Sequence, residues 1–310
     1  MICKIEKNII NLNFKNKQSM SDTMISFADN SLAENFMSME DVKKACPAAF
    51  KENPTNPNVS DKYVQANTAT VISDLEKLGW YPVQAKQCRA KRNSSGIRSF
   101  HMIAFQNPDI YIEKPDGNGG TTIDAYPRII LTNSHDGFNS FKFMVGLFRL
   151  VCSNGLVVGT DELVNMSIRH INYDFETLRD VVKTAIDKIP GIVCQMNEMK
   201  KTILSEEDKK EIATSMIKIR KNIPDEQKFD IDEETIMDIL RPERKEDEGD
   251  DLWSVFNVCQ EKMIKGGYST VNSHNKLRKQ RSITSIKKDV EYNQKLWDIA
   301  ARYMPATVAA

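Results

Sequence analysis

The chain is 310 residues long, 40% of them hydrophobic and 28% charged, and its 43 basic residues balance 43 acidic ones. This composition excludes wholesale disorder, and the length is enough for one large core or two modest ones. No apolar run reaches about 18 residues, the length that crosses a bilayer, and the lysines of residues 1–19 are not followed by a signal-peptide pattern. We therefore expect a cytoplasmic protein with no membrane partner.

The first part of the chain predicts an arm followed by two helices. Residues 1–36 are polar and rich in Asn and Ser, and we expect a weakly ordered arm. Ser38–Asp41 fits a capping box, which predicts a short helix ending before Pro47. Residues 51–60 hold the prolines and asparagines typical of a loop. Apolar residues at helical spacing then predict an amphipathic helix over Thr68–Leu78.

From Trp80 onward the sequence changes to the alternation typical of β-strands. Gln84–Lys91 and Ile97–Gln106 flank a turn signal and predict a β-hairpin with a basic tip. Further strands are predicted at 127–132, 141–150, 156–158 and 165–173, and loops at 113–122 and 133–140. Because these strands are contiguous in sequence, we expect an antiparallel β-meander over about 80–173.

The second half of the chain has helical periodicity. A helix from Asp174 is expected to kink or break at Pro190, and more helices are predicted at 192–204, 206–221, 232–240, 252–264 and 288–303. Between them, Arg241–Asp251 is predicted as a charged linker and 268–282 as an exposed basic loop. The predicted fold class is α+β, with helices before the meander and a helical C-terminal half. Its predicted parts are an arm (1–36), an α+β core domain (37–173) and a helical region (174–310) with an acidic segment and a basic loop.

Three blocks of the chain, in order, resemble one known family. They are Val59–Lys86, Leu131–Gly159 and Arg241–Gly267, and the last is followed by NQKLWDIA at 293–300. These blocks are similar to the phage and plasmid proteins grouped as domain-of-unknown-function family 932, over about residues 55–305. The resemblance implies a phage or mobile-element origin, and hence the host cytoplasm, but it brings no established activity. By analogy alone, the order of strands and helices also resembles that of single-strand annealing recombinases.

Basic residues concentrate in two segments that hold no acidic residue, Trp80–Pro108 and Lys262–Lys288. Such residues can neutralise the phosphates of a nucleic acid, and Trp80, Tyr81 and Phe100 could offer ring faces to its bases. The alternative is a solvated hairpin tip, with its aromatic residues in the core, and a flexible connector. The predicted nucleic-acid-binding residues are Lys86, Arg89, Lys91, Arg92, Arg98, Lys276, Arg278, Lys279, Arg281, Lys287 and Lys288.

A second candidate is the polar loop formed by Asn133, Ser134, His135 and Asp136. A histidine beside an aspartate suggests a general base, but adjacent residues on extended backbone point apart, so the two do not themselves form a dyad. The alternative is a polar turn in which Asn133 and Asp136 accept hydrogen bonds from backbone donors.

No pattern in the sequence predicts a cofactor or a metal. The six cysteines are far apart and no Cys/His group has the spacing of a zinc site, so we expect reduced cysteines that serve in packing. The glycines of 117–120 lack the pattern of a phosphate-binding loop.

These observations favour a protein that binds nucleic acid and is not an enzyme. The leading hypothesis is a single-stranded DNA binder used in phage or mobile-element recombination or replication, acting cooperatively as a homo-oligomer. The alternative is a protein-interaction module that targets a host factor, with an anti-defence or regulatory role. An enzyme centred on His135 and Asp136 is the third hypothesis, and no catalytic residue is assigned.

Overall fold

The computed structural model describes residues 36–52, 67–88, 99–115, 118–137, 139, 141–149, 155–158, 167–168, 174–271 and 277–305. They fall into two compact units. The sheet unit holds the described residues of Glu6–Leu150 and Gly159–Ile189, and the helical unit holds those of Val151–Val158 and Pro190–Ala310. Apart from Phe36, the predicted N-terminal arm lies outside the described residues.

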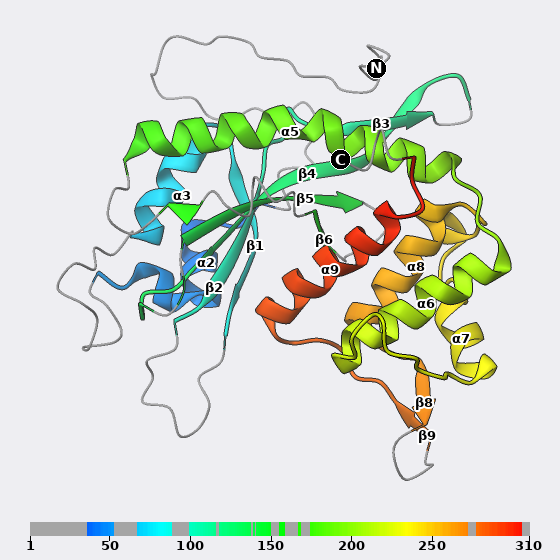
Figure 1. The fold of residues 1–310 in the computed structure, drawn as a ribbon. Coiled ribbons are helices and arrows are strands. Elements are labelled where there is room, and N and C mark those ends of the chain that lie inside the picture. The colour runs from blue at the N-terminus through cyan, green and yellow to red at the C-terminus, as the bar shows by residue number, and fades with distance from the viewer. Residues whose placement is uncertain are drawn as a thin grey trace. The chain divides into compact units, whose positions relative to one another are not determined.

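An antiparallel meander forms the sheet unit (Figure 1). Its strands are β1 (Tyr81–Gln87), β2 (His101–Gln106), β3 (Ile112–Pro115), β4 (Thr121–Asn133), β5 (Phe141–Arg149) and β7 (Ser167–Ile168). β1 pairs with β2, β2 with β4, and β4 with β5, all antiparallel. β3 pairs with the first part of β4, so β2 and β3 follow each other along one edge of this 13-residue strand. The predicted α+β class and antiparallel meander are confirmed.

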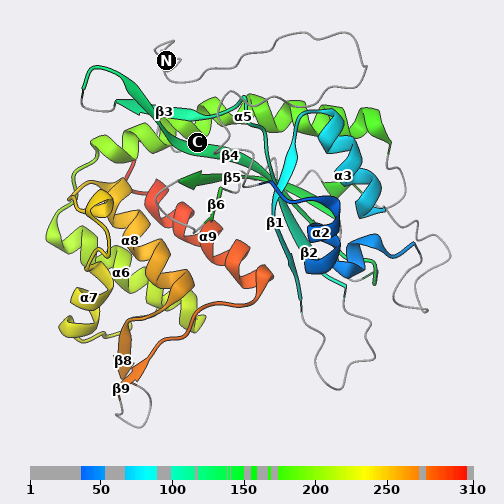
Figure 2. The same cartoon turned by 180° about the vertical axis from the view of Figure 1, so that it is seen from behind.

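The core of this unit lies around β2 and β4. β2 is buried along its whole length, a pattern typical of a strand covered on both faces. Helices α2 (Met39–Ala45) and α3 (Thr68–Lys77) both contact β1, and Figure 2 shows them beside that end of the sheet. The amphipathic α3 buries Val71, Ile72 and Leu75, so the predicted helical spacing marks the face that packs inward.

The prediction of a loop over 113–122 is wrong at both ends. Glu113 and Lys114 belong to β3, and Thr121 and Thr122 begin β4, which was predicted to start only at Pro127. These four residues are polar, and the two threonines are exposed, so no apolar alternation signals a strand. Backbone hydrogen bonds hold this part of the ladder, and the pattern of side chains in the sequence does not reveal them.

The helical unit surrounds a central helix. Helix α5 (Phe175–Lys201) begins in the sheet unit and continues through Pro190, where a kink or break was predicted. The others are α6 (Glu206–Lys221), α7 (Glu233–Leu240), α8 (Leu252–Lys265) and α9 (Ile286–Ala301), and the short strand β6 (Gly155–Val158) contacts α9. α8 is buried from Leu252 to Met263, on every side, and contacts α6, α7 and α9. None of the described helices is long and apolar enough to cross a membrane.

Two predicted connectors of the helical unit are structured. The predicted charged linker Arg241–Asp251 contains a 3₁₀ turn at Lys245–Asp247 and lies against α8, where Arg244 binds Glu261 through both guanidinium nitrogens at 2.7 and 2.5 Å. The predicted basic loop 268–282 contains a hairpin of β8 (Ser269–Val271) and β9 (Leu277–Lys279). The charged residues of both segments pair with distant residues or face solvent. Neither segment therefore has the apolar periodicity by which a helix or strand is predicted from the sequence.

Candidate functional site

The hairpin of the helical unit carries three of the predicted C-terminal basic residues, Arg278, Lys279 and Arg281. We call residues 266–271 and 277–283 the basic finger. Ser269 pairs with Lys279 and Thr270 with Arg278, and the ladder continues below β8 and β9, where Gln280 N donates to the Tyr268 carbonyl at 2.8 Å. Figure 1 shows the hairpin extending from the helices of its own unit. The finger is therefore a defined two-stranded structure.

One arginine side chain fixes the base of the finger. Arg220, near the end of α6, donates through one guanidinium nitrogen to the Met263 carbonyl and through the other to the Arg281 carbonyl, the latter at 2.7 Å. Its guanidinium carbon lies 6.0 Å from the centroid of the Tyr268 ring, within the range of a cation–π interaction. These acceptors are 43 and 61 residues away in sequence, so no local pattern could have indicated Arg220.

Helix α7 holds the outer edge of β8. The Thr235 hydroxyl donates to the Ser269 carbonyl at 3.1 Å, and the Asp238 carboxylate accepts from Ser269 N at 3.1 Å. Thr270 is buried and accepts from the Gln280 side chain at 2.7 Å. One face of the finger is thus packed, and its position relative to α6 and α7 is fixed.

Gly266 allows the two strands to meet where the finger leaves α8. Its φ is +73°, and an added Cβ would lie 2.5 Å from the Gln280 carbonyl oxygen and 2.9 Å from the Arg281 carbonyl oxygen. Gly267 also has a positive φ, +92°, but its Cβ position has no atom within 4 Å. Only Gly266 therefore combines backbone strain with close contact.

We expect Gly266→Ala to destabilise the finger by more than Gly267→Ala. Gly267→Ala adds only the strain of a positive φ, and we expect it to cost about 1 kcal/mol of stability. Gly266→Ala also forces the backbone of residues 280 and 281 to move, so we expect it to cost roughly 1–3 kcal/mol or more. Urea denaturation and amide hydrogen exchange of residues 268–280 would measure the difference. Equal losses for the two variants would contradict the proposed close contact.

Charge at the finger is exposed and of one sign. Leu277, Arg278 and Lys279 are all exposed, as is Arg281. Within the described residues, no ion pair involves Arg278, Lys279, Arg281 or Lys288, whereas other lysines of this unit form 2.7–2.8 Å pairs with glutamates. The finger therefore carries positive charge that is not neutralised by the described part of the protein.

The structure places the predicted nucleic-acid-binding residues in different parts of the molecule. Lys86 is exposed on β1 of the sheet unit, and Lys287 and Lys288 are exposed in the first turn of α9 in the helical unit. Trp80, a predicted stacking residue, is only 1% exposed and belongs to the core. The remaining predicted residues, including the basic tip of the first hairpin, lie outside the described residues: Arg89, Lys91, Arg92, Arg98 and Lys276.

The second candidate loop is buried. Asn133 ends β4 and Ser134, His135 and Asp136 follow it, and none of the four is more than 2% exposed. Asn133 Oδ1 accepts from Ser134 N at 2.7 Å, and Asp136 accepts from the Ser134 hydroxyl at 2.6 Å and from Ser99 N at 3.4 Å. The two side chains thus satisfy donors of the turn, and Asp136 also satisfies a backbone donor of Ser99 from another part of the chain.

His135 is directed to another part of the sheet unit. Its Nε2 lies 3.1 Å from the hydroxyl of Thr68, the first residue of α3, and its backbone N donates to the Ser99 hydroxyl at 2.7 Å. His101 Nε2 lies 3.0 Å from the same Thr68 hydroxyl, and the two imidazole rings meet edge to face at 5.3 Å. The His135 Nε2 and the Asp136 carboxylate therefore bind different groups, Thr68 Oγ1 for the first and Ser134 Oγ and Ser99 N for the second.

The hydrogen count at Thr68 fixes the tautomers of both histidines. His101 Nδ1 lies 2.7 Å from the Ser99 carbonyl, which can only accept, so this nitrogen carries the proton. Neutral His101 must then accept at Nε2 from the Thr68 hydroxyl. Asn133 Nδ2 donates to Thr68 Oγ1 at 3.0 Å, which leaves one lone pair for a proton on His135 Nε2.

The hydrogen bonds around Thr68 require a neutral His101, and burial keeps His101 neutral at neutral pH. The loss of hydration lowers the pKa of His101 to about 4, despite the opposing effects of the Ser99 carbonyl and of Asp136. At neutral pH the cluster joins the start of α3 to the ends of β2 and β4. A substrate cannot reach these side chains in this conformation, so the cluster gives no support to a hydrolytic or transfer reaction.

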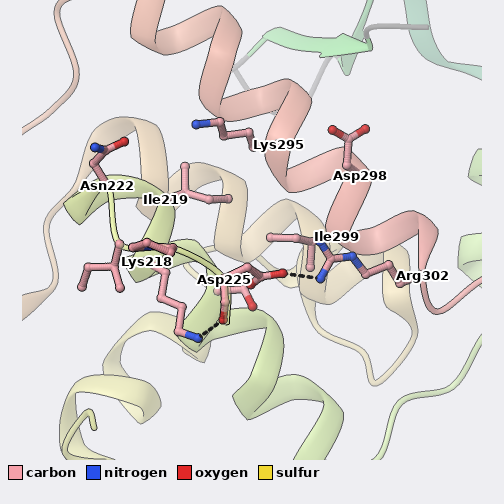
Figure 3. A pocket seen from close by; sticks show the side chains of 11 residues that line it. Lys218, Ile219, Asn222, Asp225, Lys295, Asp298, Ile299 and Arg302 are labelled. Atoms are coloured by element: carbon pink, nitrogen blue, oxygen red, sulfur yellow. Dashed lines mark hydrogen bonds and ion pairs between the residues drawn. The ribbon is translucent and has the colours of Figure 1, made fainter. Parts of the chain in front are cut away.

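A separate pocket lies between α6, the turn that follows it and α9 (Figure 3). Its volume is about 360 Å³, and Ile219 and Ile299 contribute apolar surface. Its charged rim is bound internally: Arg302 donates to the Asp225 carboxylate at 2.6 Å, and Lys218 donates to the Asp225 carbonyl at 2.6 Å. These bonds hold the turn against both helices, and we assign the pocket no ligand.

Metal ligands do not gather within the described part of the chain. It holds no group of three or more His, Cys, Asp or Glu side chains arranged to bind a metal ion. Burial raises the pKa of Cys46 and Cys259 to about 12, which makes both thiols poor nucleophiles and poor metal ligands at neutral pH.

Most of the chain matches one protein family. The family model described as "Domain of unknown function (DUF932)" matches residues 57–297. Two similar proteins of Escherichia coli K12, UPF0380 protein YafZ and UPF0380 protein YfjQ, are each 28% identical over 273 residues, which cover 85% of this chain and 90% of the relative. No solved structure matches the chain. The family match spans well over half of the sequence and confirms the resemblance, so the chain belongs to the DUF932 family.

Proposed function

We propose that the protein binds single-stranded nucleic acid, above all single-stranded DNA, and that the basic finger is part of the binding surface. One observation supports this most strongly: Arg278, Lys279 and Arg281 are exposed on a fixed hairpin and have no ion-pair partner among the described residues. Neutralising a phosphate releases condensed counterions, which favours binding. A hairpin with exposed charge of one sign is suited to contact the phosphates of a nucleic acid.

This binding would serve the recombination or replication of a phage or mobile element. Support for that role comes from the resemblance of the chain to a family of phage and plasmid proteins. Cooperative binding as a homo-oligomer is part of the proposal. No catalytic step is included, because the buried His101, His135 and Asp136 are closed to substrate. The alternative, a host protein as partner, predicts instead a complex that survives nuclease treatment.

Removing two finger charges should weaken binding in a salt-dependent way. For single strands, the slope of log K against log salt is about −0.7 for each phosphate neutralised, so we expect R278A/K279A to reduce its magnitude by about 1.4. Because this electrostatic contribution vanishes near 1 M salt, the same slope predicts an affinity loss on the order of 50-fold at about 50 mM salt. Filter binding of labelled single-stranded DNA across a salt series would measure both.

A matched control is K210A/K295A, which removes two basic residues of the same unit. Lys210 and Lys295 already form 2.8 and 2.7 Å pairs with Glu233 and Glu291, so their loss should leave the slope unchanged. A wild-type protein that does not bind at low salt, or whose binding is independent of salt, would refute the proposal.

A further inference from the structure

An exposed leucine lies within the charged part of the finger. Leu277 is 70% exposed at the start of β9 and is followed by Arg278 and Lys279. Side chains alternate across a strand, so Leu277 shares one face of the finger with Lys279, while Arg278 lies on the other face with Thr270. Thr270 is buried. Leu277 and Lys279 therefore belong to the face that is not packed against the protein.

This leucine has a fixed position. The ladder of β8 and β9, the Arg220 bonds to the Met263 and Arg281 carbonyls, and the α7 bonds to Ser269 hold the finger from three sides. Because these bonds hold the backbone of the finger, binding does not have to order the backbone that carries Leu277, which lowers the entropic cost of the contact. Phosphates would be drawn to the neighbouring cations, which brings the rest of the nucleotide close to Leu277.

The chemistry of the ligand decides what an apolar contact can recognise. In a duplex, the faces of the bases are stacked on each other and only their edges are open in the grooves. In a single strand, base faces are accessible without unstacking a duplex, and an apolar side chain such as Leu can lie against them. Charge alone favours both forms of DNA, whereas contact with a base face favours unpaired bases.

Resting on the proposed function, we propose that Leu277 contacts the faces of unpaired bases and that this contact makes the finger prefer single-stranded over double-stranded nucleic acid. Lys279, on the same face, holds a phosphate of the same strand. Leu277 supplies affinity that does not depend on salt, and Lys279 supplies affinity that does.

The two contributions can be separated by measuring salt series for L277A and K279A with a thymine oligonucleotide and with a duplex. We expect L277A to lower single-strand affinity by about 5-fold at every salt concentration, with the slope and the duplex affinity unchanged. K279A should instead reduce the magnitude of the slope by about 0.7 on the single strand. I203A is the matched control, since Ile203 is 71% exposed in the same unit but lies outside the finger; it should bind as wild type does.

A second variant tests the contact directly. The natural tryptophans Trp80, Trp253 and Trp297 are all buried, so Leu277→Trp adds an indole whose exposure differs from theirs. We expect this variant to bind single strands more tightly than wild type, because an aromatic ring stacks on bases better than leucine does. Its fluorescence should be quenched by the oligonucleotide, and bound oligonucleotide should protect it from iodide.

The inference would be overturned if wild-type protein bound single strands and L277A bound them equally well, or if L277A weakened duplex binding to the same extent. It would also be overturned if the L277W indole remained open to iodide in the complex. Absence of any salt-dependent binding by wild-type protein is a different result, which refutes the proposed function itself. Thermal unfolding of each variant confirms that the exposed substitution leaves the fold intact.

Discussion

Arg244→Ala should lower the free energy of unfolding of the helical unit by about 3–5 kcal/mol, the usual cost of removing one partner of a buried ion pair. Glu261 lies on the buried α8, and its side chain is only 7% exposed. Burial alone would raise the pKa of Glu261, but its bonds to Lys265 and Arg244 outweigh this effect and the pKa is lowered. Without Arg244, the Glu261 carboxylate keeps its Lys265 partner at 2.7 Å but loses the two strong bonds from the guanidinium.

Chemical denaturation at neutral pH measures this loss, and a double variant identifies its cause. R244A/E261Q removes the Glu261 charge together with Arg244, so it should lose less stability than R244A alone. The loss is not fully recovered, because the Asp247 carboxylate, only 2% exposed and 3.2 Å from Arg244, gives up its bond to the guanidinium in both variants. Lys44→Ala is a control on an exposed pair, because Lys44 lies 3.6 Å from Asp41 with both side chains more than half exposed; it should cost at most about 1 kcal/mol. If R244A cost no more than K44A, the segment 241–251 would not be the structural support of α8 that we describe.

Local sequence signals located most of the helices because the interactions that begin a helix are local. Ser205 and Asp208 form the reciprocal capping box that the sequence predicts, and the Ser38 side chain caps α2 by accepting from Asp41 N. Gly79 has a positive φ just after α3. In each case the residues that make the bonds lie within a few positions of one another, so their spacing is visible in the sequence.

Features built from distant residues could not be predicted in the same way. Arg244 and Glu261 are 17 residues apart, and Arg220 and Arg281 are 61 apart. The sequence shows such residues only as charges in polar segments, which is why a structured segment was predicted as a linker and a hairpin as a loop. The loop at 133–136 was indicated as polar, but its burial depends on Ser99 and Thr68, which come from other parts of the chain.

Acid should destabilise the sheet unit through His101. Its pKa is about 4 in the folded protein, against about 6.5 in an unfolded chain. The unfolded state therefore binds a proton as the pH falls below 6.5, while folded His101 stays neutral until the pH approaches 4. A difference of about 2.5 pKa units corresponds to about 3 kcal/mol in the free energy of unfolding. The protein has this stability above pH 6.5 and loses it progressively as the pH falls to about 4.

The groups that face His101 explain why folding keeps it neutral. Thr68 donates its only hydroxyl proton to Nε2, and the Ser99 carbonyl accepts from Nδ1, so a second ring proton would meet the hydrogen of Thr68. His135 lies against the ring edge to face, and Asp136 is the anion that favours protonation, although its effect is smaller than that of burial. Protonation at Nε2 therefore requires the Thr68 hydroxyl to stop donating to His101, which rearranges the hydrogen bonds that join α3 to the sheet.

His101→Gln separates this titration from the packing of the site. Glutamine does not titrate, so the variant should be less stable than wild type at pH 7 but should lose much less stability between pH 6.5 and 4. Denaturation midpoints across this range, together with the histidine pKa values from NMR, measure both effects. Exposed carboxylates whose pKa is lowered by hydrogen bonds, such as Asp208, lose their contribution only below about pH 4, so they do not fall in the same window. Parallel pH profiles for H101Q and wild type would show that another group controls the acid sensitivity, and that His101 is not the residue that folding must keep neutral.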